Sequence, residues 1–246
     1  MTIKGGANKH IITLMFLLSI SFGFGQYSNH GKITFERKTN LLKRFEGMGR
    51  MRDMITEENK IKIDKFELLF NESKSVFRPI RDVSEGRMGW MTTKNTYYQN
   101  FTDESQFTIL ALFGQNVYIQ DSLPNRQWKI TESKRDIGGY KCRKAMYEKN
   151  DSTRIYAWYT TELTTPTGPE GYCGLPGTIL GLATEDGGIV YFAKKIELMD
   201  PEKEDLVPES TKKQVFTLKE LKIKIEKDYG NTPWGKGMFD DLFRWL

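Results

Sequence analysis

The chain has 246 residues and a formal net charge of +5, because 37 Lys and Arg residues face 32 Asp and Glu residues. This positive excess is small and spread along the sequence, so it does not indicate a nucleic-acid-binding protein. Two histidines and two cysteines in the whole chain argue against Ser-His-Asp and Cys-His catalysis, and against metal sites that need two imidazole ligands.

The first 25 residues are typical of a secretory signal peptide. Residues 1–10 carry two lysines and no acid, residues 11–20 are almost entirely apolar, and Gly23 and Gly25 supply small residues at a cleavage site. An uncleaved anchor is the alternative, but the apolar span is short for a transmembrane helix. We therefore expect cleavage after Gly25, an exported mature chain, and no transmembrane span in it.

The mature chain begins with a predicted strand over residues 31–38, where apolar and polar residues alternate. Apolar residues at three- and four-residue spacings over 41–60 predict a helical segment, which Gly47 and Gly49 break or turn into a mobile flap. The methionines at 48, 51 and 54 are the residue type that binds Cu(I). Without a neighbouring cysteine or histidine, their pattern favours adaptable core filling or an apolar contact surface.

Short β-type segments follow, joined by polar turns, and predict an antiparallel meander. They cover residues 66–77, 88–101, 107–120 and 127–133. Residues 140–149 and 154–163 flank the turn 150–153 and predict a hairpin. In its second strand, one face carries Ile155, Ala157 and Tyr159 and the other carries Tyr156, Trp158 and Thr160. Aromatic residues on both faces indicate a strand covered on both sides.

Residues 168–182 are the most constrained stretch, because five glycines and two prolines precede or interrupt an apolar segment. Glycine permits positive φ and close backbone approach, whereas proline fixes φ and removes a donor. A structural connection packed on a sheet and a binding or docking loop are the two interpretations. The stretch lacks the spacing of a phosphate-binding loop, and Pro176 has no backbone N–H to offer an anion.

The part of this stretch from Tyr172 to Leu180 reads Tyr-Cys-Gly-Leu-Pro-Gly-Thr-Ile-Leu. It resembles the signature of the GLPGLI family, exported proteins of Bacteroidota-type bacteria, with Thr178 where the family name has Leu. The similarity continues upstream through residues 128–130, 137–145 and 157–160. The resemblance implies a location in the periplasm or at the outer-membrane periphery, and no established reaction. Some relatives occur alongside outer-membrane receptor systems, which implies an outer-membrane protein or receptor complex as a partner.

Within the motif, we expect Gly174, Leu175, Pro176 and Gly177 to set the shape of a structural or docking loop. Tyr172 and Trp158 are the aromatic residues expected to pack against it or to contact a partner.

The two cysteines, Cys142 and Cys173, both lie in the mature chain. In an exported protein an even pair predicts a disulfide, which would tether the glycine-rich loop to the strand that carries Cys142. Closing a loop of about 32 residues would stabilise the fold by about 3 to 4 kcal/mol. Two buried thiols are the alternative, because the sequence does not give the Cα separation that a disulfide requires.

The C-terminal third predicts a second hairpin, a linker and a helix. Residues 178–183 and 189–198 flank a turn with an Asp-Gly step, and residues 200–211 are rich in charge and proline. Thr217 and Glu220 form a capping box for a helix over 217–229. Residues 233–246 are amphipathic and either dock on the sheet or bind a partner or membrane surface.

The whole pattern predicts a mainly β fold with a few helices (α+β): a curved antiparallel sheet or half-barrel with a helical flap and a C-terminal helix. We expect one domain over residues 26–230, between a signal peptide (1–25) and an amphipathic tail (231–246).

Two classes of function fit this pattern. The first is a non-enzymatic binding or accessory protein of the cell envelope, including a carrier that holds a lipid or another hydrophobic ligand in the half-barrel. The second, less favoured, is a hydrolase that uses carboxylates such as Asp136, Glu148 or Glu170. We expect no catalytic residue, no cofactor, no metal ion and no nucleic-acid partner.

Overall fold

The structure is a computed structural model, and it describes residues 27–80, 89–112, 114–150, 153–232 and 243. The predicted signal peptide (1–25) lies outside these residues, as does residue 26. The strands are β1 (Gly31–Asn40), β2 (Ile61–Phe70), β3 (Lys74–Pro79), β4 (Thr96–Asn100), β5 (Ser105–Leu112), β6 (Gln115–Ser122), β7 (Trp128–Ile137), β8 (Tyr140–Asn150), β9 (Thr153–Thr160), β10 (Thr178–Thr184), β11 (Ile189–Glu197) and β12 (Val215–Phe216). The α-helices are α2 (Leu41–Arg44), α3 (Arg50–Asp53) and α4 (Leu218–Tyr229), and the 3-10 helices are η1 (Gly89–Met91), η2 (Pro169–Gly171) and η3 (Lys203–Leu206).

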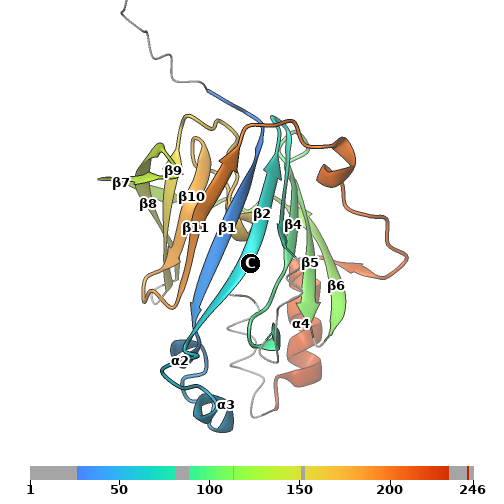
Figure 1. The fold of residues 1–246 in the computed structure, drawn as a ribbon. Helices are drawn as coiled ribbons and strands as arrows, with labels where there is room; N and C mark the ends of the chain where they lie inside the picture. The colour runs from blue at the N-terminus through green and yellow to red at the C-terminus, as the bar shows by residue number, and fades with distance from the viewer. Residues whose placement is uncertain (1–26, 81–88, 113, 151–152, 233–242, 244–246) are drawn as a thin grey trace, which may run out of the picture.

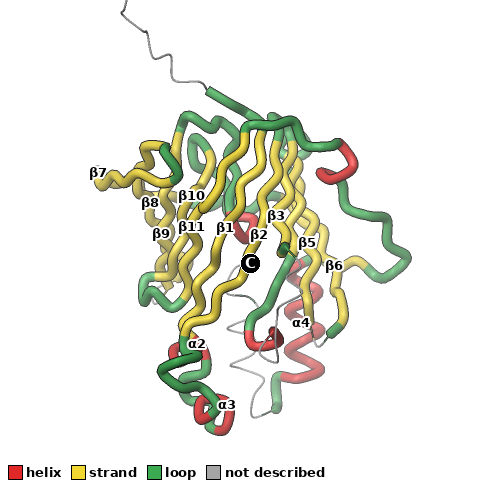
Figure 2. Tube along the Cα trace, viewed as in Figure 1, coloured by secondary structure: helices red, strands yellow, loops and turns green. Residues whose placement is uncertain are grey.

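All twelve strands join one open sheet, in the order β12-β6-β5-β4-β3-β2-β1-β11-β10-β9-β8-β7. Every neighbouring pair is antiparallel except β12 and β6, which run parallel and make the sheet mixed. Figures 1 and 2 show that strands dominate and that helices lie mainly at the margins. The prediction of a mainly β chain with a few short helices is confirmed.

The long pairing of β1 with β2 and β11 sets the centre of the sheet, and alternate residues of β1 are buried. After β1 the chain turns into α2, where the side chain of Asn40 accepts a hydrogen bond from the backbone N–H of Lys43. Gly47 and Gly49 then adopt positive φ and separate α2 from α3. The predicted break in this helical segment is confirmed, and both helices lie beyond the ends of β1 and β2 (Figure 1).

The two faces of the sheet differ in what covers them. We call the inner face the one that carries the main hydrophobic cluster, to which Phe35, Phe66, Tyr97 and Tyr191 belong. The connection 161–177 between β9 and β10 packs on this face, and α4 covers it beside β5 and β6, where Leu221 and Ile225 join a second cluster. The opposite, outer face is covered in part by η3, whose Leu206 packs against β2 and β3.

The helix α4 begins as the sequence predicts, because Thr217 and Glu220 form a complete capping box. The predicted tail lies largely outside the described residues. Within residues 233–246 the structure describes Phe243, which packs against the cluster formed by α4, β5 and β6. The side chain of Lys149 donates a hydrogen bond to the backbone carbonyl of Phe243.

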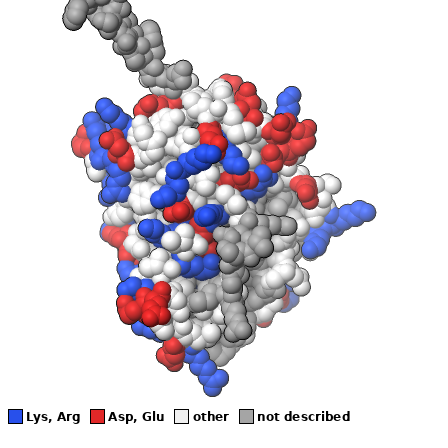
Figure 3. Space-filling view, viewed as in Figure 1, with Lys and Arg blue, Asp and Glu red and all other residues white. Residues whose placement is uncertain are grey.

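Figure 3 shows patches of Lys and Arg side chains interspersed with patches of Asp and Glu side chains on the face that it presents. In the part of the chain that the structure describes, no helix combines the length and apolar character needed to cross a membrane.

Candidate functional site

The glycine-rich loop that the sequence singles out connects β9 to β10, and its shape depends on particular glycines. Gly177 has a φ of 138°, and a Cβ placed there would lie 2.0 Å from the carbonyl oxygen of Thr160. A Cβ on Gly168 would lie 2.6 Å from the Cβ of Ile179. Any larger residue at these two positions therefore requires the backbone or β10 to move.

The side chains of the Gly-Leu-Pro-Gly motif divide between the core and the surface. Leu175 and Tyr172 are buried, whereas Gly174 and Pro176 are exposed. The Tyr172 ring packs edge-on against the ring of Trp128, with 6.0 Å between centroids. Tyr172 and Leu175 thus pack in the core, and a docking role stays a prediction for the exposed Gly174 and Pro176.

Buried polar side chains fix the loop to the inner face. Gln99 donates a hydrogen bond to the carbonyl of Gly171 at 2.9 Å, and Arg126 donates another to the same oxygen at 3.1 Å. The guanidinium of Arg126 also lies 4.1 Å from the centroid of the Tyr172 ring. These contacts tie η2 to β4 and to the segment before β7.

Glu170, in η2, links the loop to the centre of the sheet. Its backbone has a φ of 54°, unusual for a residue with a side chain, and its carboxylate is buried. The hydroxyl of Tyr191 donates a hydrogen bond to Glu170 Oε1, and Arg37 Nη1 lies 3.7 Å from the same oxygen. Arg37 in turn pairs with Asp64, with 2.8 Å between Nη2 and Oδ2.

Asp64 is held in its charged form by the groups around it. Burial disfavours the charged carboxylate, but Arg37 and a 2.6 Å hydrogen bond from Lys62 outweigh that penalty and lower the pKa of Asp64 to about 2. The hydroxyl of Thr92 also donates to Asp64 Oδ2 at 2.9 Å. The buried ionic cluster of Arg37, Asp64 and Glu170 thus joins β1, β2, β11 and the loop, which indicates a bracing role.

The three carboxylates considered for a hydrolase do not form one site. Glu170 is enclosed in the buried ionic cluster, whereas Asp136 is exposed at the end of β7. Glu148 lies on β8 and pairs with Lys129 and Arg154. The structure therefore places no two of these acids opposite each other across a cleft.

The disulfide predicted between Cys142 and Cys173 is absent, because both residues are free, buried thiols. Cys142 pairs with Arg135 on β7, whereas the carbonyl of Cys173 accepts a hydrogen bond from Trp128, at the other end of that strand. Those two positions on β7 are about 20 Å apart, and a disulfide needs Cα atoms within about 7 Å. The prediction is corrected to the alternative of two buried thiols.

Burial, together with the nearby charges of Glu162 and Asp136, raises the pKa of the Cys142 thiol to about 12. Burial also raises the pKa of Cys173, although Arg126 opposes that shift. Neither thiol has the lowered pKa of a reactive cysteine.

Trp158 lies on the outer face of β9, apart from the motif. Its ring is half-buried, 6.2 Å from the ring of Phe192, with the guanidinium of Arg135 at 4.7 Å from its centroid. The loop and Trp158 are thus on opposite faces of the sheet, and do not form one contact surface.

The methionines that suggested a soft-metal site are surface residues: Met48, Met51 and Met54 are all exposed. Within the described ranges, no group of three or more His, Cys, Asp and Glu side chains is arranged to hold a metal ion.

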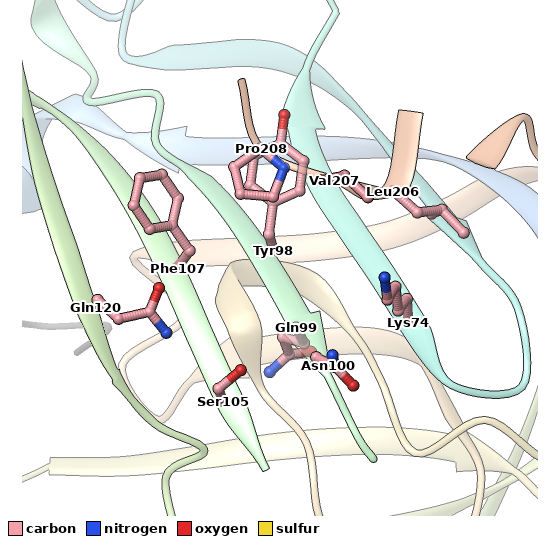
Figure 4. A pocket seen from close by; sticks show the side chains of 10 residues that line it. All are labelled: Lys74, Tyr98, Gln99, Asn100, Ser105, Phe107, Gln120, Leu206, Val207 and Pro208. Carbon is pink, nitrogen blue, oxygen red and sulfur yellow. The ribbon is translucent and has the colours of Figure 1, made fainter. Parts of the chain in front are cut away.

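A pocket on the outer face is a further feature, one that the sequence does not reveal. Its volume is about 190 Å³, and its floor is formed by β3, β4, β5 and β6 (Figure 4). The residues that line it are Lys74, Tyr98, Gln99, Asn100, Ser105, Phe107, Gln120, Leu206, Val207 and Pro208. The last three come from η3 and the segment after it, which the sequence suggested to be a linker or exposed loop.

Strand register explains how these residues meet. Tyr98 pairs with Phe107, and Phe107 pairs with Gln120, so these three side chains form one row across β4, β5 and β6. Lys74 pairs with Asn100, which pairs with Ser105, in the adjacent row. An aromatic row and a polar row therefore lie side by side on the floor of the pocket.

The pocket and the glycine-rich loop lie on opposite sides of the same strands. Gln99 shows this relation, because its side chain points to the inner face and bonds to Gly171, while its neighbours Tyr98 and Asn100 line the pocket. The two features are separated by a single layer of sheet.

A family model described as "Protein of unknown function (Porph_ging)" matches residues 147–181, from the end of β8 through the loop into β10. The match includes the glycine-rich loop but covers a small part of the chain. No curated protein is significantly similar to the chain in sequence.

Similar solved structures include two structures of a protein named PNGF-II in different space groups. They have TM-scores of 0.52 and 0.50, both at 16% identity, and cover 80% and 79% of this chain. An uncharacterized conserved protein from Thermus thermophilus has a TM-score of 0.40 at 10% identity, covering 77% of this chain and 91% of its own. The chain spans about a third of the PNGF-II chains, 33% and 32%. At this identity, the likeness to PNGF-II is one of fold alone.

Proposed function

We propose that the protein is a non-enzymatic binding protein of the cell envelope, and that the outer-face pocket is its ligand site. The pocket is the single observation that carries the proposal. It combines two aromatic side chains with polar groups in a concave site, which is the usual composition of a small-molecule pocket.

The burial of the loop supports different roles for the two faces of the sheet. The inner face holds the loop through hydrogen bonds and the buried ionic cluster, so its polar groups serve the fold. The outer face keeps polar side chains beside a cavity. We therefore place ligand binding on the outer face, and a supporting role on the inner face.

The proposed location is the periplasm or the outer-membrane periphery. It rests on the signal peptide predicted over residues 1–25, and on the resemblance to the GLPGLI family, of which we propose the chain is a member. An outer-membrane protein or receptor complex is the proposed partner. We further propose that the sheet is curved into a half-barrel, with α2 and α3 as its helical flap.

A carrier that holds an acyl chain inside such a half-barrel has less support. Large side chains such as Phe35, Phe66 and Tyr191 are fully buried on the inner face, and the loop packs over them. A lipid would have to displace these contacts. The hydrolase alternative has less support still, because Asp136, Glu148 and Glu170 lie apart.

The test is affinity purification of the tagged full-length protein from its own cell envelope in mild detergent. Bound proteins, lipids and small molecules are identified by mass spectrometry. Phe107→Ser removes an aromatic ring from the floor of the pocket. Ile223→Ser, at an exposed position of α4, is the matched control.

A small molecule retained by the wild type and by Ile223→Ser, but lost from Phe107→Ser, is the expected result. Bound lipid that all three proteins retain would favour the carrier instead. The absence of any bound small molecule from all three would contradict the proposed site.

A further inference from the structure

We propose that the outer-face pocket selects a small carboxylate that carries a flat ring, with the ring against Phe107 and Tyr98 and the carboxylate bound by Lys74. This inference rests on the proposed function, since it names the class of ligand for the same site.

The aromatic row sets the apolar part of the ligand. The rings of Tyr98 and Phe107 lie 6.5 Å apart between centroids and are inclined at 57° to each other. The Phe107 ring is also 6.0 Å from that of Tyr118. Half-buried rings in this arrangement offer a surface to a flat apolar group. Burial of apolar area and edge or offset stacking would both stabilise that group in the pocket.

The polar row determines which polar group the ligand carries. Its side chains differ in whether they already form hydrogen bonds within the protein. The amide of Asn100 is committed, because its oxygen accepts from the N–H groups of Thr102 and Asp103 and its nitrogen donates to Asp103. By contrast, the side chains of Ser105 and Gln120 form no hydrogen bond with any described residue. Each of these two groups can donate or accept a hydrogen bond, so both can donate to a carboxylate oxygen that Lys74 holds.

Lys74 is the one charged side chain among the pocket's lining residues. It is half-buried and makes no ion pair within the described ranges. Figure 4 shows its ammonium group on the same side of the sheet as the ring of Tyr98. An ammonium beside a pocket favours an anion, and a charge-assisted hydrogen bond is about twice as strong as a neutral one.

Charge at the other end of the Tyr98 ring fixes the orientation. Burial raises the pKa of the Tyr98 hydroxyl, Arg78 opposes that shift, and Glu209 and Asp205 add to it. Arg78 is already paired with Asp205 and Glu67. Because the charge of Arg78 is already compensated by these two acids, and Lys74 makes no ion pair with a described residue, the ammonium of Lys74 is the better partner for a carboxylate.

The dimensions agree with one ring and one carboxylate. A pocket of about 190 Å³ is smaller than the sites of about 300 to 1,000 Å³ that hold drug-sized ligands. The two rows are two residues apart along each strand, or about 7 Å. A single ring that bears a carboxylate spans both rows.

The experiment compares benzoate with benzamide, which has nearly the same shape and no charge, by isothermal titration of the purified full chain. Lys74→Met removes the ammonium and keeps most of the aliphatic stem, and Lys65→Met, at an exposed position of β2, is the charge-matched control. Phe107→Ser tests the ring contact. Circular dichroism and melting temperature verify that each variant is folded.

The wild type and Lys65→Met are expected to bind benzoate about tenfold more tightly than benzamide. Lys74→Met should abolish this preference, and Phe107→Ser should weaken both probes. Equal binding of the two probes, or a preference that survives in Lys74→Met, would overturn the ligand class while leaving the pocket as a binding site. If neither probe binds to the wild type, the ligand class fails, and the envelope purification decides separately whether the pocket binds another small molecule.

Discussion

The two sides of strands β3, β4 and β5 differ in how their polar side chains are used. On the inner face, Ser75, Gln99 and Gln106 are buried and hydrogen-bonded to one another or to the loop. On the outer face, Lys74 and Ser105 adjoin the pocket without such bonds among described residues. The same strands thus stabilise the fold with one face and present donors with the other. We therefore expect substitutions on the inner face to change mainly the stability of the fold, and substitutions on the outer face to change mainly ligand binding.

The largest expected effect comes from removing the central cation of the buried ionic cluster. Arg37→Met leaves Asp64 and Glu170 without their shared partner, so we expect the free energy of unfolding to fall by about 3 to 5 kcal/mol. Urea denaturation measures it, and Lys65→Met should change the same quantity by less than about 0.5 kcal/mol. A loss below about 1 kcal/mol in Arg37→Met would mean that the cluster does not brace the loop.

The next effect concerns the shape of the loop. Gly177→Ala places a Cβ 2.0 Å from the Thr160 carbonyl, so we expect a loss of about 3 kcal/mol. Gly187→Ala is the matched control, because Gly187 also has a positive φ but no atom lies within 4 Å of the added Cβ. The control should lose about 1 kcal/mol. Equal losses of unfolding free energy in the two variants would contradict this prediction, because they would show that the close contact at Gly177 does not destabilise the fold.

A smaller effect appears as pH dependence. The pKa of Asp64 is about 2 in the folded protein and about 4 in an unfolded chain. Its contribution to stability, about 2 kcal/mol, is therefore fully present above pH 4 and is lost as the pH falls toward 2. The difference in unfolding free energy between wild type and Asp64→Asn, measured by urea denaturation from pH 6 downward, should narrow over that window. A difference that stays constant down to pH 2 would contradict the ionised Asp64.

Reduction of the cysteines is expected to have no effect on stability. With Cys142 and Cys173 as free thiols, a reducing agent should leave the melting temperature unchanged within about 1 °C, whereas cleaving a disulfide would cost about 3 to 4 kcal/mol. A thiol reagent should label both cysteines in urea and neither in the folded protein, because both are buried. Rapid labelling of the folded protein would show that one thiol is accessible.

Local signals in the sequence predict the local structure well. The capping box at Thr217, the Asp-Gly turn between β10 and β11, and the break at Gly47 and Gly49 depend on residues close together in the chain, and all three are found. The segment 107–120 shows the limit of such signals. It reads as one β-type stretch, but Gly114 adopts positive φ and the structure divides it into β5 and β6.

The features that depend on strand register are not visible in the sequence. Arg37 meets Asp64 and Tyr191 because β1 pairs with both β2 and β11, whose residues are distant in the chain. The disulfide prediction failed for the same reason, since register carries Cys142 and Cys173 to different ends of β7. The pocket requires a segment that reads as a linker to fold over the outer face, which no local pattern indicates.

The most direct test of the contrast between the two faces is chemical-shift mapping by NMR on the full chain, with benzoate as the probe. We expect saturable shifts of the backbone amides of Lys74, Tyr98, Phe107 and Gln120, around the outer-face pocket, and weaker binding of benzoate in Phe107→Ser. Amides of the buried ionic cluster, such as those of Arg37 and Asp64, should stay unperturbed. Shifts that centre on the inner face instead, around Glu170 and Tyr191, would contradict the placement of the ligand site on the outer face.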